Sequence, residues 1–98
     1  MNRPQKLDDT TVAKWLASHS GWELAAGKAL ARTYKLPNFA AALALVVKVG
    51  TEADKRDHHP DIELGYGRAR FTWSTHDAGG ITQLDLDLAA ATDAFSNG

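Results

Sequence analysis

The segment from Phe39 to about Arg56 constrains the fold most, because it predicts one long amphipathic helix. Its apolar residues recur at helical spacing, and Asn38 immediately before it is a good N-cap. Pro60 disfavours the helical conformation at the preceding residue, so the helix is expected to end by about His58. The residues expected on its buried side are Phe39, Leu43, Val46, Val47 and Ala53.

Shorter elements are predicted on both sides of this helix. A first helix follows the N-cap Asp8 and ends near residues 19–21. Residues 22–36 alternate as two short strands around an Ala-Ala-Gly turn, and residues 62–73 alternate in the same way, so each predicts a hairpin. A last helix begins after Thr82.

The predicted order is therefore helix, hairpin, helix, hairpin, helix. This order indicates an α+β two-layer fold, a four-stranded antiparallel sheet with three helices on one face. The 98 residues form a single domain, 1–98, in which residues 1–6 are expected to be a loose tail. The uncovered face of the sheet is expected to carry aromatic and aliphatic residues and to favour self-association.

Composition excludes several classes of protein. The net charge is −1 and the basic residues are spread along the chain, which argues against a nucleic-acid surface. The longest apolar run, 39–47, is far shorter than the roughly 20 residues of a membrane span. The first residues contain no apolar segment typical of a secretion signal, and the chain has no cysteine. Disulfides and cysteine catalysis are thus excluded, and a cytoplasmic location is expected.

The pair His58-His59, followed by Pro60, is the first candidate for chemistry. Asp54 and His58 are spaced i and i+4, so a hydrogen bond that fixes the imidazole tautomer is expected. Pro60 turns the chain, so His59 should point along a different vector and approach the same volume from another direction. Two such imidazoles can protonate one atom and deprotonate another. The alternative is a solvated helix end, where cationic histidine is favoured by the helix dipole.

His76 and Asp85 are two further candidates. His76 is expected to end the fourth strand, close to the end of the long helix, whereas His19 lies in a loop outside this set. Thr82-x-x-Asp85 fits a capping box, in which Asp85 satisfies the start of the last helix. A metal site is the less favoured interpretation of the histidines, because no His-x-x-x-His pair is present and adjacent ligands diverge.

The spacing of these residues resembles the signature of the pterin-4a-carbinolamine dehydratases. The pattern is Asp54-x3-His58-His59-Pro60-x5-Tyr66-x9-His76-x8-Asp85, and the segments GW at 21–22, LPNFAAAL at 36–43, STHDAGGIT at 74–82 and DLDLA at 85–89 are similar too. The resemblance covers nearly the whole chain from about Leu7. One departure is Asp54, where many family members have Glu.

The resemblance implies a reaction on a pterin substrate, an aromatic amino acid hydroxylase as a functional partner, and self-assembly. Family members dehydrate 4a-hydroxytetrahydrobiopterin, the product of aromatic amino acid hydroxylases, to quinonoid dihydropterin, without metal or organic cofactor. They assemble into homodimers and in some members homotetramers. Some animal members also act as dimerisation cofactors of a homeodomain transcription factor, so a non-catalytic pterin-binding or regulatory module is the alternative.

The resemblance also assigns roles to residues. His59 and His76 are expected to transfer protons at the 4a-hydroxyl, with His58 assisting. Asp54 and Asp85 would orient the histidines. The pterin would contact Asp57, His58, His59, Ser74, Thr75, His76 and Asp77, with Pro60 and Trp22 in supporting positions.

Overall fold

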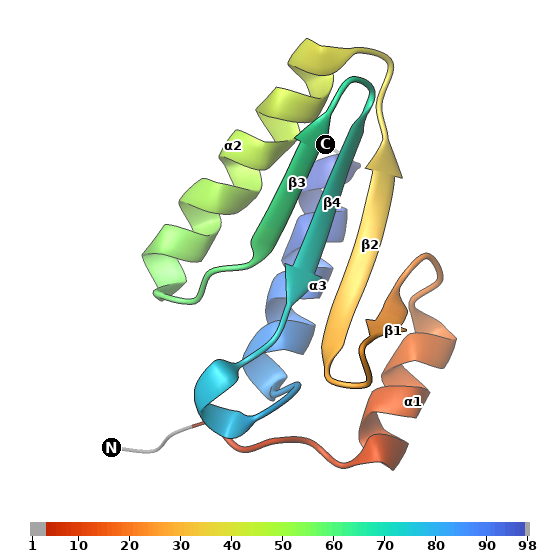
Figure 1. Cartoon of the computed structure of the whole chain (residues 1–98), viewed down its shortest axis with the longest axis vertical. Helices are drawn as coiled ribbons and strands as arrows, with labels where there is room; N and C mark the ends of the chain where they lie inside the picture. Colours follow the sequence, from red (N-terminus) through yellow and green to blue (C-terminus); the bar gives the residue numbers. More distant parts are fainter. Residues whose placement is uncertain (1–3, 98) are drawn as a thin grey trace.

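The computed structural model describes residues 4–97 and shows helices and strands in the predicted order (Figure 1). The elements are α1 (Asp9–Ser18), β1 (Glu23–Ala25), β2 (Ala29–Lys35), α2 (Phe39–Arg56), β3 (Asp61–Gly65), β4 (Arg68–Trp73), the short 3₁₀ helix η1 (His76–Ala78) and α3 (Gln83–Ser96). The two hairpins, the long helix with its N-cap Asn38 and the α+β fold class are confirmed. None of the helices within residues 4–97 has the length and apolar character needed to cross a membrane.

The four strands form one antiparallel sheet in the order β1-β2-β4-β3. The two hairpins join through their second strands, because β2 pairs with β4. Leu30 faces Trp73 in this register, and Tyr34 faces Ala69. The start of β2 therefore lies beside the end of β4, where the chain turns into η1.

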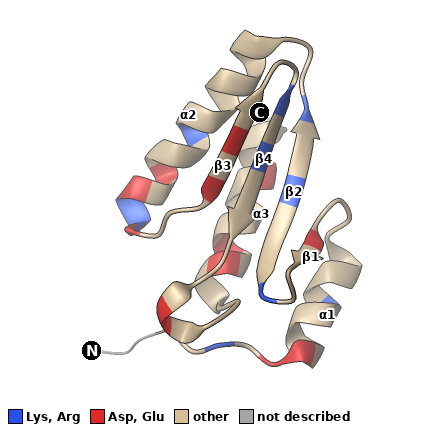
Figure 2. Ribbon diagram, in the orientation of Figure 1, with Lys and Arg blue, Asp and Glu red and all other residues tan. Residues whose placement is uncertain are grey.

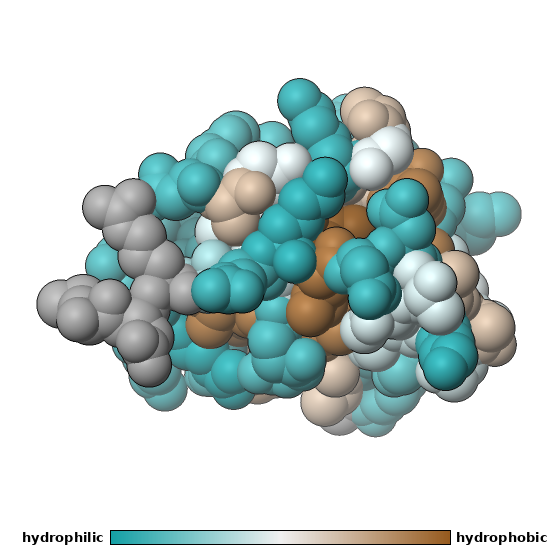
Figure 3. Space-filling view, turned by 90° about the horizontal axis from the view of Figure 1, so that it is seen from below, coloured by the Kyte–Doolittle hydropathy of each residue, from teal (hydrophilic) through white to brown (hydrophobic). Residues whose placement is uncertain are grey.

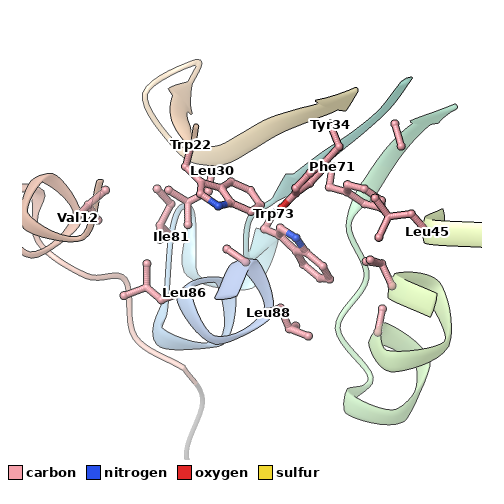
Figure 4. Close-up of a cluster of buried hydrophobic side chains, with 14 residues drawn as sticks. Val12, Trp22, Leu30, Tyr34, Leu45, Phe71, Trp73, Ile81, Leu86 and Leu88 are labelled. Carbon is pink, nitrogen blue, oxygen red and sulfur yellow. The ribbon is translucent and has the colours of Figure 1, made fainter. Parts of the chain in front are cut away.

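The core lies between one face of the sheet and helices α2 and α3 (Figure 4). Trp73 is its largest fully buried side chain and lies between the sheet and α3, with its indole nitrogen 3.3 Å from Thr92 Oγ1. Burying an aromatic side chain of this size contributes about 2–3 kcal/mol. α1 lies beside β1 and extends the core through Val12 and Trp15 (Figure 1).

The face that α2 buries differs from the predicted one. The helix buries Ala42, Leu45, Val49 and Ala53, which lie at helical spacing on one side. Ala53 was predicted there, but Phe39, Leu43 and Val47 are exposed by 46%, 43% and 58%. Val46, also predicted there, is partly buried and packs against the core. The prediction was wrong for the other three residues because residues 39–47 are all apolar, so their spacing did not select a face. Small alanines allow the helix to lie close to the sheet.

The uncovered face of the sheet is polar, which corrects the expected aromatic surface. Side chains alternate along a strand, so the register that turns Phe71 and Trp73 toward the helices turns Arg70 outward. Arg70 donates to Thr33 Oγ1 at 3.1 Å and to Glu23 Oε1 at 2.9 Å. Figure 2 shows basic residues on β2 and β4 and acidic residues on the neighbouring strand β3.

The segment before α1 runs along the η1 end of the molecule. Leu7 N donates to Ile81 O at 2.8 Å, and the methylenes of Lys6 lie against Gly80. Of the predicted loose tail, residues 1–3 lie outside the described residues, and residues 4–6 contain neither helix nor strand.

Candidate functional site

The end of α2 separates the two adjacent histidines. The helix ends at Arg56, and Asp57 adopts a left-handed conformation with φ 50° and ψ 41°. Beyond it, His58 turns inward, with 12% of its side chain exposed, while the side chain of His59 is 55% exposed. The predicted divergence of the two imidazoles is thus present, and it arises at Asp57 as well as at Pro60.

His58 is held from two sides. Its ring stacks on Trp73, with centroids 6.0 Å apart and planes at 15°. Its Nε2 lies 2.7 Å from Asp85 Oδ1. An ionised carboxylate only accepts hydrogen bonds, so Nε2 is the donor and Nδ1 keeps the lone pair in the neutral ring.

Asp85 is fully buried and has several partners. Its Oδ2 accepts from Thr75 Oγ1 at 2.8 Å and from Thr82 N at 2.9 Å. The capping box with Thr82 is therefore confirmed. The same carboxylate caps the start of α3 and contacts His58. Asp85 can therefore be a helix cap and a partner of His58 at the same time.

The expected hydrogen bond between Asp54 and His58 is wrong. Asp54 Oδ1 lies 2.8 Å from Nε2 of His59 instead. The i,i+4 argument requires that the helix continue through His58, but the left-handed Asp57 ends it first. This pair is exposed, with 81% of the Asp54 side chain accessible.

The third histidine lies just past the sheet. β4 ends at Trp73, and His76 begins η1 rather than ending the strand as predicted. A bridge between Thr75 and Gly80, with Thr75 N donating to Gly80 O at 2.9 Å, closes the loop that carries His76. The His76 side chain is exposed at the surface of this loop.

The residues predicted to contact the ligand line one cavity of about 270 Å³. Its lining consists of Asp57, His58, His59, Ser74, Thr75, His76 and Asp77. Three imidazoles and two carboxylates thus surround one volume, brought together from the end of α2 and from the loop after β4. Imidazoles can donate and accept protons near neutral pH, and carboxylates can accept hydrogen bonds from N–H groups of a ligand.

Two predicted supporting residues, Pro60 and Trp22, do not line this cavity. Trp22 lies in the core, and its indole nitrogen donates to Asp93 Oδ2 at 3.0 Å. Within residues 4–97, no group of three or more His, Cys, Asp or Glu side chains is arranged to hold a metal ion.

The sequence interpretation missed Lys28. This residue lines a smaller cavity that adjoins the histidine cavity. No local sequence signal marks Lys28, because its place beside residues 74–76 depends on how the β1–β2 turn lies against the end of β4.

A separate apolar cavity lies between α1 and the β1–β2 turn. Its apolar lining is Leu7, Val12, Ala13, Leu16, Leu24 and Ile81, with Lys6, Asp9 and Lys28 among its polar residues. Figure 3 views the molecule from this end and shows apolar residues framed by hydrophilic ones. No histidine lines this cavity, so the histidine cavity is the better candidate for acid–base chemistry.

Comparisons with known proteins show which family this chain resembles. A family model described as Pterin 4 alpha carbinolamine dehydratase matches residues 5–95. A protein of Chloroflexus aggregans is 42% identical over 90% of this chain and 94% of its own length, and one of Thermomicrobium roseum is 46% identical over 86% and 89%. Both are named pterin-4-alpha-carbinolamine dehydratase, and the names present this activity as an assignment rather than a measurement.

Two solved structures are similar in fold. A structure from Brucella melitensis described as a transcriptional coactivator/pterin dehydratase has a TM-score of 0.88 and 29% identity, covering 94% of this chain and 99% of that one. A pterin dehydratase-like protein described as a RuBisCO assembly factor of the alpha-carboxysome has a TM-score of 0.68 and 18% identity, covering 82% of this chain and 94% of that one. The second likeness shows the fold alone.

Proposed function

Because the chain belongs to the pterin 4 alpha carbinolamine dehydratase family, we propose that its histidine cavity dehydrates 4a-hydroxytetrahydropterins. The observation that carries the proposal is the single cavity in which His58, His59 and His76 meet. The product of this hydro-lyase reaction is a quinonoid dihydropterin, and the substrate is the compound that an aromatic amino acid hydroxylase releases.

The reaction needs one proton donor and one proton acceptor. A protonated imidazole donates its proton to the 4a-hydroxyl, and the lone pair of the adjacent ring nitrogen forms a C=N bond as water leaves. A second group then removes a proton from a ring nitrogen, which yields the neutral quinonoid product. Each such proton transfer accelerates a reaction by roughly 10²- to 10⁴-fold.

The geometry supports different roles for the three histidines. His58 is nearly enclosed and fixed between Asp85 and Trp73, which suits a residue that positions the ring and assists. His59 and His76 are exposed at the cavity and are free to exchange protons with a ligand and with solvent. We therefore assign the proton transfers at the 4a-hydroxyl to His59 and His76. Asp57 and Asp77 accept hydrogen bonds from the pterin N–H groups.

The test is the loss of chemically generated 4a-hydroxytetrahydropterin, followed by absorbance. Wild-type protein is expected to accelerate it, and His59→Ala and His76→Ala should each lower the acceleration by roughly 10²-fold or more. His19→Ala is the matched control, because His19 stacks on Trp15, outside the cavity. Circular dichroism should show a folded domain in all variants. An unchanged spontaneous rate with wild-type protein would leave the regulatory or pterin-binding role as the better explanation.

Self-association is part of the proposal. Phe39, Leu43 and Val47 form an exposed apolar row on α2, spaced by one helical turn. A second copy of the chain that packs against this row would remove it from water. Sedimentation is expected to show an oligomer that Val47→Glu dissociates. Leu24→Glu, a change at an exposed leucine on β1, should leave the oligomer intact.

A further inference from the structure

A smaller cavity of about 120 Å³ shares part of its lining with the histidine cavity. Its lining is Lys28, Ser74, Thr75, His76, Gly79 and Gly80. Ser74, Thr75 and His76 line both cavities, so the two volumes adjoin across this loop. We refer to the smaller volume as the Lys28 cavity.

Lys28 lies at the end of the β1–β2 turn, where its backbone N–H donates to Ala25 O at 3.0 Å. Two residues further along the chain, Leu30 of β2 faces Trp73 of β4 in the antiparallel pairing. The turn therefore lies near the end of β4, where the chain leaves the sheet toward η1, and Lys28 is exposed there.

The two adjoining volumes differ in charge. Asp57 and Asp77 line the histidine cavity, whereas Lys28 is the charged residue that lines the Lys28 cavity. Within residues 4–97, no carboxylate lies within ion-pair distance of Lys28. A ligand that spans both volumes thus meets carboxylates at one end and an ammonium group at the other.

A pterin has a matching polarity. The 2-amino group and the adjacent ring N–H donate hydrogen bonds, which suits carboxylates, and the substituent on C6 leaves the opposite end of the bicycle. We propose that Lys28 binds the C6 substituent and that this protein prefers pterins whose C6 substituent is anionic, a carboxylate or a phosphate. This inference rests on the proposed function and adds a substrate class to it.

The experiment measures the affinities of three fluorescent probes near pH 7: neutral 6-methylpterin, pterin-6-carboxylate and 6-hydroxymethylpterin phosphate. Wild-type protein is expected to bind at least one anionic probe roughly 3- to 5-fold more tightly than the neutral one, the size of one exposed charge pair. Comparing the two anionic probes distinguishes carboxylate from phosphate. Raising the salt concentration should reduce the preference.

Substitutions distinguish the effect of Lys28 on binding from the effect of the overall charge of the protein. Lys28→Gln should abolish the preference and leave the affinity for 6-methylpterin unchanged, while Lys28→Arg should keep it. Lys14→Gln is the matched control, since Lys14 is an exposed lysine of α1 that lines neither volume. It should change no affinity.

The outcomes distinguish the two proposals. Binding of 6-methylpterin and dehydratase activity, with no preference for an anionic probe or with a preference that survives in Lys28→Gln, would overturn the role of Lys28 and keep the proposed function. A wild-type protein that binds none of the probes and does not accelerate dehydration would overturn both.

Discussion

His58 Nε2 lies 2.7 Å from Asp85 Oδ1 although the two residues are 27 positions apart, one after the end of α2 and the other in the first turn of α3. Asp85 is fully buried and also caps α3. One carboxylate thus connects the start of a structural helix to an imidazole of the cavity. Stability and activity should therefore change together when Asp85 is altered.

Asp85→Ala is expected to lower the free energy of unfolding by about 3 kcal/mol, because it leaves the buried partners Thr75, Thr82 and His58 without their acceptor. Activity should fall by roughly 10-fold or more in protein that is still folded, since His58 loses its orientation. Urea unfolding and dehydration kinetics measure the two effects. Asp87→Ala removes an exposed carboxylate from the same helix and should change neither. Equal costs for the two variants would contradict the role of Asp85.

The pair of Asp54 and His59 should behave differently, because both side chains are exposed. Asp54→Asn is expected to leave the urea midpoint unchanged and to lower activity only roughly 2- to 5-fold. Asp54→Glu keeps a carboxylate and should retain the activity. Asp61→Asn, the same chemical change at an exposed position of β3, is the control. A loss of activity as large as that of Asp85→Ala would show that the exposed pair contributes more to activity than expected here.

Local signals in the sequence were sufficient for much of the fold. Asn38 and Pro60 bracketed the long helix, and the Thr82–Asp85 capping box marked the start of α3. Alternation marked both hairpins. These features depend on residues only a few positions apart.

Contacts that depend on distant or unusual backbone were not predictable. Asp54 binds His59 rather than His58 because of one left-handed residue, Asp57, a conformation that Asp adopts but does not require. Lys28 lies in the β1–β2 turn and lines a cavity with residues 74–76, which are far from it in the sequence. The buried face of the first half of α2 could not be chosen because residues 39–47 are all apolar.

Replacing Asp57 by glycine is expected to raise stability and to lower activity. Its φ of 50° suits glycine, so Asp57→Gly should raise the free energy of unfolding by about 0.5–1 kcal/mol. Its carboxylate lines the cavity, so the same change should lower activity by roughly 10-fold. Ala26→Gly is the matched control, because Ala26 has φ 52° in the β1–β2 turn and lines neither site volume. It should stabilise the protein without loss of activity. Full activity of Asp57→Gly would remove Asp57 from the site.

Tyr34 is expected to make the free energy of unfolding depend on pH in alkaline solution. Its hydroxyl donates to Asp93, which also accepts from Arg32 Nη1 at 2.9 Å. Burial of the phenol, together with the adjacent Asp93 carboxylate, raises the pKa of Tyr34 above the ordinary tyrosine value of about 10. Above that pH the unfolded chain loses the phenolic proton while the folded protein keeps it. The unfolded state then binds fewer protons, so the free energy of unfolding falls as pH rises.

The loss from Tyr34 should reach at most about 1.4 kcal/mol for each pH unit above 10. Tyr34→Phe is expected to lower stability at pH 8, because Asp93 loses one donor, and to make the alkaline decline shallower. Tyr66→Phe is the matched control, since it makes the same chemical change at a tyrosine that is 73% exposed. Urea unfolding between pH 8 and 11 compares the three proteins. Parallel alkaline declines in wild-type and Tyr34→Phe protein would show that Tyr34 does not account for the slope.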